Sequence, residues 1–373
     1  MIKVNLQYAW QPGPGQDHVV DAALFRVLYA VSETGSLAGA ARSLGLSYRH
    51  VWGLMGKWEG VFGGPLAHLR QGRGAQLTEF GRKLLWAEQL VQARLSESLE
   101  GVRHEIEQVL AQTGGGPRLA LSVSHDLALA ELRDRLAQRP GLKLDLRFQG
   151  SLESLCALAK NQCALAGFHV AEGMEQSALA AFRDYLDPRR HVLIGLATRT
   201  QGLMVARGNP KHISSLADLT RDGVRIVNRQ RGSGSRVEFD QLLSGVGVSG
   251  RAIAGYLDEE FTHLAVAARV AGGRADAGYG IKAAAAQYEL DFLPLLTERY
   301  YLACDREALV DPAVAELLDL LRSAEFRAIL ASLAGYGSAI TGNLHAVDEA
   351  LPGARAPRTA ARSTARGKAP AGD

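Results

Sequence analysis

Cysteine is scarce in this chain, with three among 373 residues: Cys156, Cys163 and Cys304. They show no metal-ligand spacing, and a small odd number is typical of a reducing cytoplasm rather than of a disulfide-bonded secreted domain. We interpret Cys156 and Cys163 as two core positions. We therefore expect no cofactor requirement and no metal bound directly by protein side chains.

Long apolar runs are also missing. No stretch is long enough to span a bilayer, and the N-terminus lacks a charged segment followed by an apolar stretch of the kind found in signal peptides. We therefore expect a cytoplasmic location and no membrane partner. The formal net charge is a mild +3, so any strongly basic surface has to be local.

Residues 35–62 predict two short helices around a tight turn. Leu37 to Leu44 carries small apolar residues at helical spacing, and Gly45 then tolerates the positive φ found at helix C-termini. Ser47 is placed to cap a second helix. This pattern is typical of a helix–turn–helix, whose second helix enters the major groove of DNA; an ordinary αα-hairpin is the alternative.

A β-wing is predicted directly after the second helix. Gly63-Gly64-Pro65 ends that helix, and residues 67–78 predict a strand, a Gly-rich turn and a second strand. Seven basic residues and two acidic ones lie between Ser36 and Lys83, a local net charge of +5. Because neutralising phosphates requires such an excess, we predict a DNA-binding domain. The charged residues are Arg42, Arg49, Lys57, Arg70, Arg73, Arg82 and Lys83 against Glu59 and Glu79.

Eight residues are predicted to contact DNA. Side chains near the start of the second helix face bases, whereas those on its later turns and on the wing meet phosphates. The base-facing residues are Tyr48, Arg49 and His50; the phosphate-facing residues are Lys57, Arg70 and Arg73; and Ser36 and Ser47 stand at the two helix starts.

Composition divides the chain into segments. We expect a flexible arm over 1–18, a winged helix–turn–helix over 19–77, a long helix over 78–112, a two-lobed domain over 117–345 and a disordered basic tail over 350–373. The apolar residues of the long helix exceed what a small winged domain covers, which predicts a dimerisation helix; packing on its own chain is the alternative. The tail lacks the apolar residues needed to bury a core.

The region after the hinge at 113–117 alternates predicted strands and helices. Such alternation predicts mainly parallel sheets covered on both faces, with ligands at the carboxyl ends of the strands. We expect strands over 191–196 and 202–205, and again over 292–296 and 300–303.

A Gly-Ser loop is the sharpest candidate for a ligand site in this region. It runs from Asn228 to Arg236, directly after a predicted strand over 224–227. Glycines at a strand–helix junction let backbone N–H groups converge on an anion, and the helix dipole adds positive potential. The predicted contacts in the loop are Arg229, Arg231, Gly232, Ser233, Gly234, Ser235 and Arg236.

Other predicted strand ends and helix starts carry hydroxyl and imidazole groups, which suit a small oxyanion or a phosphorylated ligand. They add Ser124, His125, Ser151, His169, Thr262 and His263 to the predicted ligand contacts. The loop lacks the lysine and spacing of a Walker A motif. Ser124 and His125 are adjacent, so they point opposite ways on a strand, and no G-x-S-x-G elbow occurs; we therefore expect no enzyme activity.

The first region resembles the winged helix–turn–helix of ModE- and LysR-type regulators. The resemblance covers about residues 20–110, and its Ser-Tyr-x-x-x-Trp stretch and Gly-rich wing favour ModE. The small β-domains in which ModE itself ends are missing from this sequence. The residues that carry the resemblance are Thr34-Gly35-Ser36-Leu37, Ala40-Ala41, Leu46-Ser47-Tyr48, Val51-Trp52, Gly72-Arg73-Gly74, Leu77-Thr78 and Gly81.

The second region resembles, over about 117–340, the periplasmic-binding-protein-like domain that occurs fused to such DNA-binding modules and in molybdenum-related proteins. Its matching motifs include Ser124-His125-Asp126, Ala166-Gly167-Phe168-His169, Asn228–Arg236 and Glu260-Phe261-Thr262-His263. The resemblance implies two lobes that close on a ligand, with the chain crossing between them near 197–203 and 294–300.

We therefore expect an α+β winged helix–turn–helix followed by an α/β two-lobed domain, acting as a homodimeric or higher oligomeric transcription regulator. Its partners would be double-stranded operator DNA and a small anionic effector that binds one conformational state better than the other. The family implies molybdate or tungstate. The several arginines instead favour a phosphorylated pterin or a molybdopterin-type ligand, and an enzyme acting on such a ligand is the alternative from another class.

Overall fold

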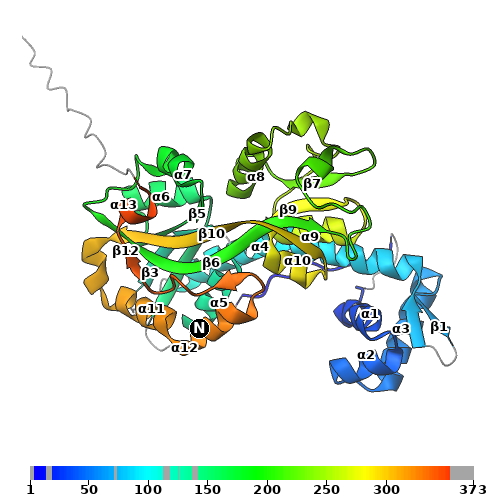
Figure 1. Cartoon of the computed structure of the whole chain (residues 1–373). Helices are drawn as coiled ribbons and strands as arrows, with labels where there is room; N and C mark the ends of the chain where they lie inside the picture. Colours follow the sequence, from blue (N-terminus) through cyan, green and yellow to red (C-terminus); the bar gives the residue numbers. More distant parts are fainter. Residues whose placement is uncertain are drawn as a thin grey trace, which may run out of the picture. The chain divides into compact units, whose positions relative to one another are not determined.

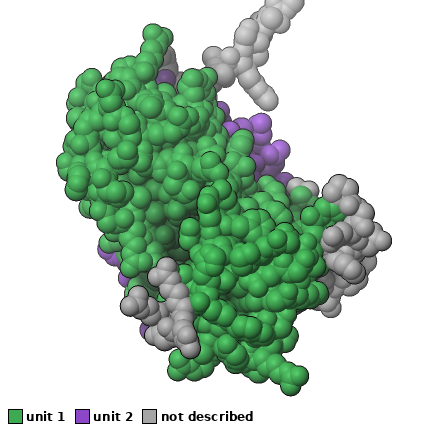
Figure 2. All heavy atoms as spheres, turned by 90° about the vertical axis from the view of Figure 1, so that its right-hand side faces the viewer, with its two compact units in different colours: residues 1–116, 199–298, 329–337 green, residues 117–198, 299–328, 338–373 purple. Residues whose placement is uncertain are grey.

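The computed structural model describes residues 4–13, 19–70, 74–111, 118–124, 126–136 and 142–352. The chain forms two compact units (Figure 2). Unit 1 comprises residues 1–116, 199–298 and 329–337, and unit 2 comprises residues 117–198, 299–328 and 338–373. The predicted tail from residue 353 onward and the predicted hinge at 113–117 lie outside the described residues.

The N-terminal part of unit 1 is a winged helix–turn–helix (Figure 1). Its elements are α1 (Ala22–Thr34), α2 (Leu37–Leu44), α3 (Tyr48–Phe62), β1 (Ala67–Arg70) and β2 (Gly74–Leu77), with β1 and β2 antiparallel. The three helices and the wing enclose one apolar core around the fully buried Trp58. The fold class predicted for this region is confirmed.

Local capping explains where the helices begin and end. The Ser36 and Ser47 hydroxyls accept hydrogen bonds from the N–H groups of Gly39 and His50, at 2.9 and 3.1 Å. Gly45 ends α2 at a φ of 65°, a conformation that costs a glycine little. Short-range signals of this kind are why the sequence predicts these two helices closely.

The N-terminal segment 4–13 packs on the molecule, which corrects the expectation of a flexible arm for these residues. The Tyr8 hydroxyl donates to Glu88 at 2.7 Å, and the Trp10 indole N–H also donates to that carboxylate. The Trp10 ring lies 5.8 Å from the Phe25 ring. Tyr8 and Trp10, two residues apart, hold this segment in place. The Gly- and Pro-rich residues that follow them are the reason why the sequence predicts a flexible arm instead.

The long helix α4 (Glu79–Ala111) follows the wing. Thr78 begins it: its hydroxyl accepts from the Gly81 N–H at 2.9 Å and donates to the Pro65 carbonyl at 2.8 Å. At Gly81, a Cβ atom would lie 2.2 Å from the Leu66 carbonyl oxygen, so only glycine fits there.

The remainder of unit 1 is an α/β lobe. Strand β9 pairs antiparallel with β6 and parallel with β7, and β7 pairs parallel with β8. The elements are β7 (Ile226–Arg229), α8 (Gly234–Gly245), β8 (Glu259–Glu260), α9 (His263–Ala271), β9 (Ala277–Ile281), α10 (Lys282–Gln287), β11 (Tyr336–Gly337) and the short 3-10 helices η1 (Ala217–Thr220) and η2 (Gly250–Ala252).

Unit 2 contains a second α/β lobe in which β3 pairs parallel with both β4 and β5. The C-terminal strand β12 pairs antiparallel with β6. The elements are β3 (Arg118–Val123), α5 (Leu127–Leu136), β4 (Lys143–Phe148), α6 (Ser151–Ala159), β5 (Leu165–Ala171), α7 (Glu175–Phe182), η3 (Arg306–Val310), α11 (Pro312–Arg322), α12 (Ala324–Ser332), β12 (Leu344–His345) and α13 (Val347–Ala350); the residues of α12 from Ile329 onward belong to unit 1.

Two long strands contribute residues to both units: β6 (His191–Val205) and β10 (Asp291–Asp305). The sequence predicted two separate strands in each of these segments. The prediction was wrong because the intervening residues of β6, among them Arg199 and Gln201, are buried through ion pairing and hydrogen bonding rather than through apolar side chains. The two-lobed α/β class itself is confirmed.

Candidate functional site

The exposed side of α3 carries the predicted base-facing residues. Tyr48 is 51% exposed, and Arg49 and His50 are exposed beside it. Trp52, one turn further on, is 49% exposed and lies 6.2 Å from the Tyr48 ring in a stacked arrangement. Trp52 is not among the predicted DNA contacts. Its position one turn after Tyr48 places it on the same side of the predicted helix, which is the pattern that could have indicated it.

The other predicted DNA contacts differ in exposure and in the interactions they make within the protein. Lys57 is exposed, and its ammonium lies 4.8 Å from the centroid of the Trp58 ring. The hydroxyls of Ser36 and Ser47 are engaged in capping their helices. The backbone of Arg70 ends β1, whereas Arg73 lies outside the described residues.

The Gly-Ser loop lies between β7 and α8, as predicted. Gly232 has a φ of 85°, and Ser233 begins α8 by accepting from the Arg236 N–H at 3.3 Å. The Ser233 hydroxyl also donates to the Gln230 carbonyl at 2.9 Å. The N–H groups of Gly234 and Ser235, in the first turn of α8, have no acceptor within the helix because of their position.

Ser235 connects the loop to its surroundings. Its hydroxyl is buried and lies 3.3 Å from the His263 Nε2 atom and 3.3 Å from the Gln201 side-chain nitrogen. The structure therefore brings together Ser235 and His263, two predicted ligand contacts that are 28 residues apart.

The arginines of the loop are paired within the protein. Arg236 is 5% exposed, forms ion pairs with Asp240 and Glu259 at 3.1 and 3.3 Å, and stacks on the Tyr256 ring. Arg229 donates to the Phe261 carbonyl at 2.8 Å. The exposed Arg231 lies 3.7 Å from Glu259. The positive charge that the sequence assigned to an incoming anion is thus largely met by protein groups.

A polar cluster lies next to Ser235. Arg199 forms a buried ion pair with Glu298 at 2.6 Å, and Gln201 donates to the same carboxylate at 2.7 Å. The Gln201 amide also lies 3.2 Å from Glu238. Burial, followed by the charge of Glu298, raises the pKa of Glu238 well above its ordinary value. Two carboxyl groups that share one cation favour retention of a proton on one of them.

In unit 2, two predicted residues meet a third that was not predicted. The Ser124 hydroxyl lies 3.2 Å from His169 Nδ1, and Tyr300 donates to the Ser124 carbonyl at 3.1 Å. The His169 and Tyr300 rings are 4.1 Å apart. Ser151 occupies the first turn of α6. His125 lies outside the described residues.

Thr262 serves a different purpose from the predicted one. Its buried hydroxyl accepts from the Ala265 N–H at 2.9 Å to cap α9 and donates to the Ala93 carbonyl of α4 at 2.8 Å. Next to it, Glu260 is buried and receives two hydrogen bonds from Arg94, one of them at 2.8 Å. Thr262 is therefore a contact to the long helix, which no local pattern indicates.

More contacts join α4 to this lobe within unit 1. The Trp86 indole N–H donates to the Ala268 carbonyl at 2.9 Å, and the Tyr288 hydroxyl lies 3.3 Å from the Gln89 carbonyl. Leu90 and Ala93 pack against the buried alanines of α9. The alternative of a helix packed on its own chain thus holds for residues 86–94.

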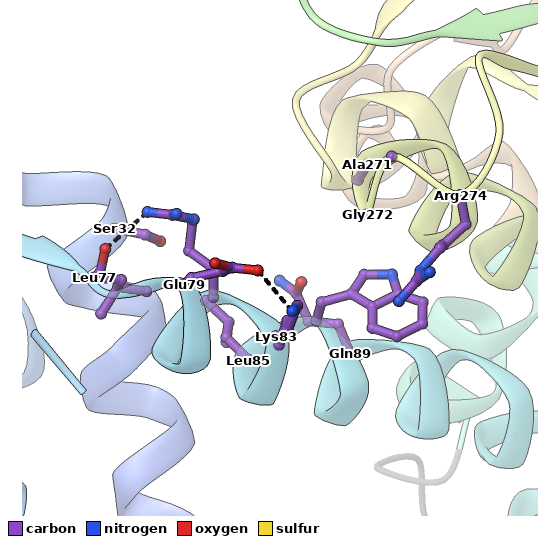
Figure 3. Close-up of a pocket in the computed structure, with 12 residues that line it drawn as sticks. Ser32, Leu77, Glu79, Lys83, Leu85, Gln89, Ala271, Gly272 and Arg274 are labelled. Atoms are coloured by element: carbon purple, nitrogen blue, oxygen red, sulfur yellow. Dashed lines mark hydrogen bonds and ion pairs between the residues drawn. The ribbon is translucent and has the colours of Figure 1, made fainter. Parts of the chain in front are cut away.

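A hollow of about 670 Å³ lies beside the first turns of α4 (Figure 3). Its cations already have partners: Arg82 donates to the Leu77 carbonyl at 2.8 Å, Lys83 pairs with Glu79 at 2.6 Å, and Arg274 lies over the Trp86 ring. We assign it no ligand.

The described residues contain no cluster of three or more His, Cys, Asp or Glu that would hold a metal ion. Burial raises the pKa of Cys163 to about 11 and that of Cys304 to about 12, so both remain thiols at neutral pH. In the same part of the chain, no helix has the length and apolar character needed to cross a membrane.

Comparison with known families agrees with this architecture. Residues 133–322, about half of the chain, match the PBP superfamily domain, and residues 23–82 match the bacterial regulatory helix-turn-helix proteins of the lysR family. The chain therefore belongs to the PBP superfamily, and its N-terminal region is similar to the helix-turn-helix of lysR-family regulatory proteins.

Individual relatives cover different parts of the chain. The uncharacterized protein YvgK of Bacillus subtilis is 32% identical over 63% of this chain and 75% of its own length. The molybdenum-pterin-binding protein MopA of Rhodobacter capsulatus is 34% identical over 26% of this chain and 36% of its own length. The structure of full-length LysG of Corynebacterium glutamicum with bound effector arginine is 17% identical, covers 80% of this chain and 95% of that one, and has a TM-score of 0.39.

Proposed function

We propose that this regulator binds operator DNA as a homodimer, through α3 and the wing, and responds to molybdate or tungstate bound at the Gly-Ser loop. The observation that carries the choice of ligand is the internal pairing of Arg229 and Arg236. The uncharged donors at the loop are the N–H groups that begin α8 and the Ser235 hydroxyl, which lies 3.3 Å from His263 Nε2. A small tetrahedral dianion suits several neutral donors and a helix N-terminus.

A molybdopterin-type ligand is the second candidate, and one observation favours it. Phe261 is 65% exposed, and its own carbonyl accepts from Arg229 of the loop. The Arg231 side chain is 74% exposed. A pterin would stack on an exposed aromatic ring, and its phosphate would use an accessible cation. The name of MopA, as a molybdenum-pterin-binding protein, is compatible with either ligand.

We propose that the segment Glu259–His263 carries the signal to the DNA-binding domain. Residues of this short segment contact two different partners: Glu259 pairs with loop arginines and His263 faces Ser235, whereas Glu260 and Thr262 bind α4. A ligand that changes the loop therefore acts on a segment that also holds the long helix. Such a ligand shifts the equilibrium only by its difference in affinity for the two states.

The dimer contact is proposed on the C-terminal half of α4. Leu95, Val102 and Ile106 are 36%, 48% and 37% exposed, and with Leu99 they follow the alternating four- and three-residue spacing of a two-stranded coiled coil. Replacing Val102 and Ile106 by Glu is expected to give monomers in sedimentation without unfolding the lobe. A dimer that survives both substitutions would place the interface elsewhere.

Thermal melting in the presence of molybdate, tungstate, sulfate or phosphate tests the ligand. Saturating molybdate and tungstate are expected to stabilise the protein, by about 2.7 kcal/mol at one hundred times the Kd. Ser235→Ala should remove this stabilisation, whereas Ser244→Ala, at the exposed far end of the same helix, should keep it. A pterin ligand would give the opposite pattern: no effect of molybdate alone, and sensitivity of binding to Phe261→Ala and Arg231→Ala. Full stabilisation of Ser235→Ala by molybdate would exclude this loop.

A further inference from the structure

The outer side of α3 has three parallel zones. At 3.6 residues per turn, the side farthest from the core carries Arg49 and then three glycines, Gly53, Gly56 and Gly60. One flank of this glycine row carries the stacked Tyr48 and Trp52 rings, and the other flank carries His50 and Lys57.

The packing of the domain explains neither the aromatic pair nor the glycine row. About half of the surface of Tyr48 and of Trp52 is exposed to water. The apolar core of the domain lies on the other side of the helix, so it does not account for these two rings. A Cβ atom at Gly53, Gly56 or Gly60 would meet nothing within 4 Å. Glycine inside a helix is less stable than alanine, so these positions favour alanine unless something else contacts this side.

The charges of α3 indicate the nature of the partner. Its exposed charged side chains, Arg49 and Lys57, are basic. The acidic residue of the helix, Glu59, is half-buried and accepts hydrogen bonds from the N–H groups of Leu66 and Ala67, at 2.8 and 3.3 Å. The outer side of α3 therefore complements a polyanion. Duplex DNA fits this charge better than a protein surface that lacks an acidic patch.

We infer that Tyr48 and Trp52 form an apolar plate that reads thymine methyl groups in the major groove, and that Gly53 and Gly56 keep the middle of α3 bare so that the helix lies close to the base edges. This inference rests on the proposed binding of DNA through α3. The thymine C5-methyl is the apolar group that base pairs present in the major groove, and apolar side chains contact it there. Lys57, on the opposite flank, is then directed to a phosphate.

Selection of random duplexes by the purified full-length protein gives the DNA probe for the test. Replacing each thymine of the selected duplex by deoxyuridine removes only the methyl group. At the contacted positions the wild-type protein should lose roughly four-fold in affinity per methyl, the value of one buried methyl-sized group. Trp52→Ala should bind the thymine and uracil duplexes equally while keeping the salt dependence that phosphate contacts produce.

The possible results separate the inference from the proposed function. Equal wild-type affinity for the thymine and uracil duplexes, with a sequence-specific footprint intact, would overturn the apolar plate and leave operator binding standing. Failure to select any preferred duplex would overturn both. Retained discrimination in Trp52→Ala, with thermal melting showing a folded protein, would also overturn the role of this residue.

The glycine row has its own matched set of variants. Gly53→Ala and Gly56→Ala should raise the melting temperature and weaken duplex binding several-fold, because an added methyl group holds the helix away from the bases. Gly60→Ala, further along the same row toward the end of the helix, should raise the melting temperature and leave duplex binding unchanged. Wild-type affinity in the Gly53 and Gly56 variants would rule out the close approach.

Discussion

Two regions of this molecule are rich in basic residues, and the structure treats their charges in opposite ways. On α3, Arg49 and Lys57 are exposed on the outer side of the helix. In the Gly-Ser loop, Arg236 is held by two carboxylates and an aromatic ring, and Arg229 is bonded to a backbone carbonyl. The basic side chains of α3 are therefore accessible to a binding partner, whereas Arg229 and Arg236 stabilise the conformation of the loop through contacts within the protein.

The comparison teaches that a count of cations does not measure the charge available to a ligand. The loop arginines contribute rigidity and hold neutral donors in place, which is a suitable arrangement for a small dianion. Uncompensated cations suit the phosphates of a duplex, where released counterions drive binding. Replacing the basic residues of α3 or of the Gly-Ser loop, or the groups that contact them, tests this difference between the two regions.

The largest effect is expected from Arg49→Ala. Losing a side chain that we propose to face bases should weaken operator binding by about 1–3 kcal/mol and relax the base preference at one position. Quantitative footprinting on the selected duplex measures both. Arg251→Ala, exposed and in the other lobe of unit 1, is the control. An unchanged footprint and affinity in Arg49→Ala would refute this placement.

Arg236→Met should destabilise the Gly-Ser loop, because Arg236 holds the loop in place and is not free to bind a ligand. The variant loses charge-assisted hydrogen bonds to Asp240 and Glu259, which predicts a loss of about 2 kcal/mol in the free energy of unfolding. Arg231→Met, at an exposed side chain 3.7 Å from Glu259, should cost roughly 0.5 kcal/mol or less. Urea denaturation compares the two, and equal losses would mean that the two arginines do not differ as described.

Arg94→Ala tests whether the two regions communicate. Removing one of the two cationic partners of the buried Glu260 carboxylate, the other being Arg269 at 3.5 Å, should lower stability by about 1.5 kcal/mol. More specifically, the variant should still be stabilised by molybdate but should no longer change its DNA affinity when molybdate binds. Lys83→Ala, which removes an exposed pair with Glu79 in the same helix, should keep the response. A normal response in Arg94→Ala would argue against the Glu259–His263 segment as the link.

The smallest effect concerns pH. Because the pKa of Glu238 is raised in the folded state, its protonated form contributes stability that is complete below the ordinary carboxyl value of 4.5. That contribution is lost as the pH rises from there through the folded-state pKa. Glu238→Gln should therefore flatten the fall in melting temperature above pH 4.5. Parallel curves for the two proteins would show that the carboxyl group does not hold its proton.

Much of the fold follows from short-range signals in the sequence. Ser47 caps α3 and Gly45 ends α2 where the sequence places them, and the structure shows that Ser36 and Ser233 cap helices as well. The loop between β7 and α8 likewise follows from local chemistry, because a strand, glycines and a capping serine lie within one stretch of sequence.

The predictions that changed concern partners far away in the chain. Arg94 and Glu260 are 166 residues apart, and the Thr262 hydroxyl reaches Ala93 across 169 residues. No periodicity or motif in the sequence indicates such pairings. The sequence therefore predicts a ligand contact for Thr262 and a dimerisation helix for α4. The pairing of Arg231 and Arg236 with Glu259 has the same origin, because that carboxylate is supplied by a different strand, whereas the Asp240 partner of Arg236 is a local i, i+4 neighbour.

The length of α4 gives its attachment to α9 a geometric meaning. The helix is held between Trp86 and Arg94, while the wing ends just before Glu79. At about 1.5 Å per residue, roughly 10 Å of helix separates the wing from the first held residue. A tilt of about 5° at that residue would therefore move the start of α4 by about 1 Å, which changes the position of the recognition helix relative to the base edges that it has to match.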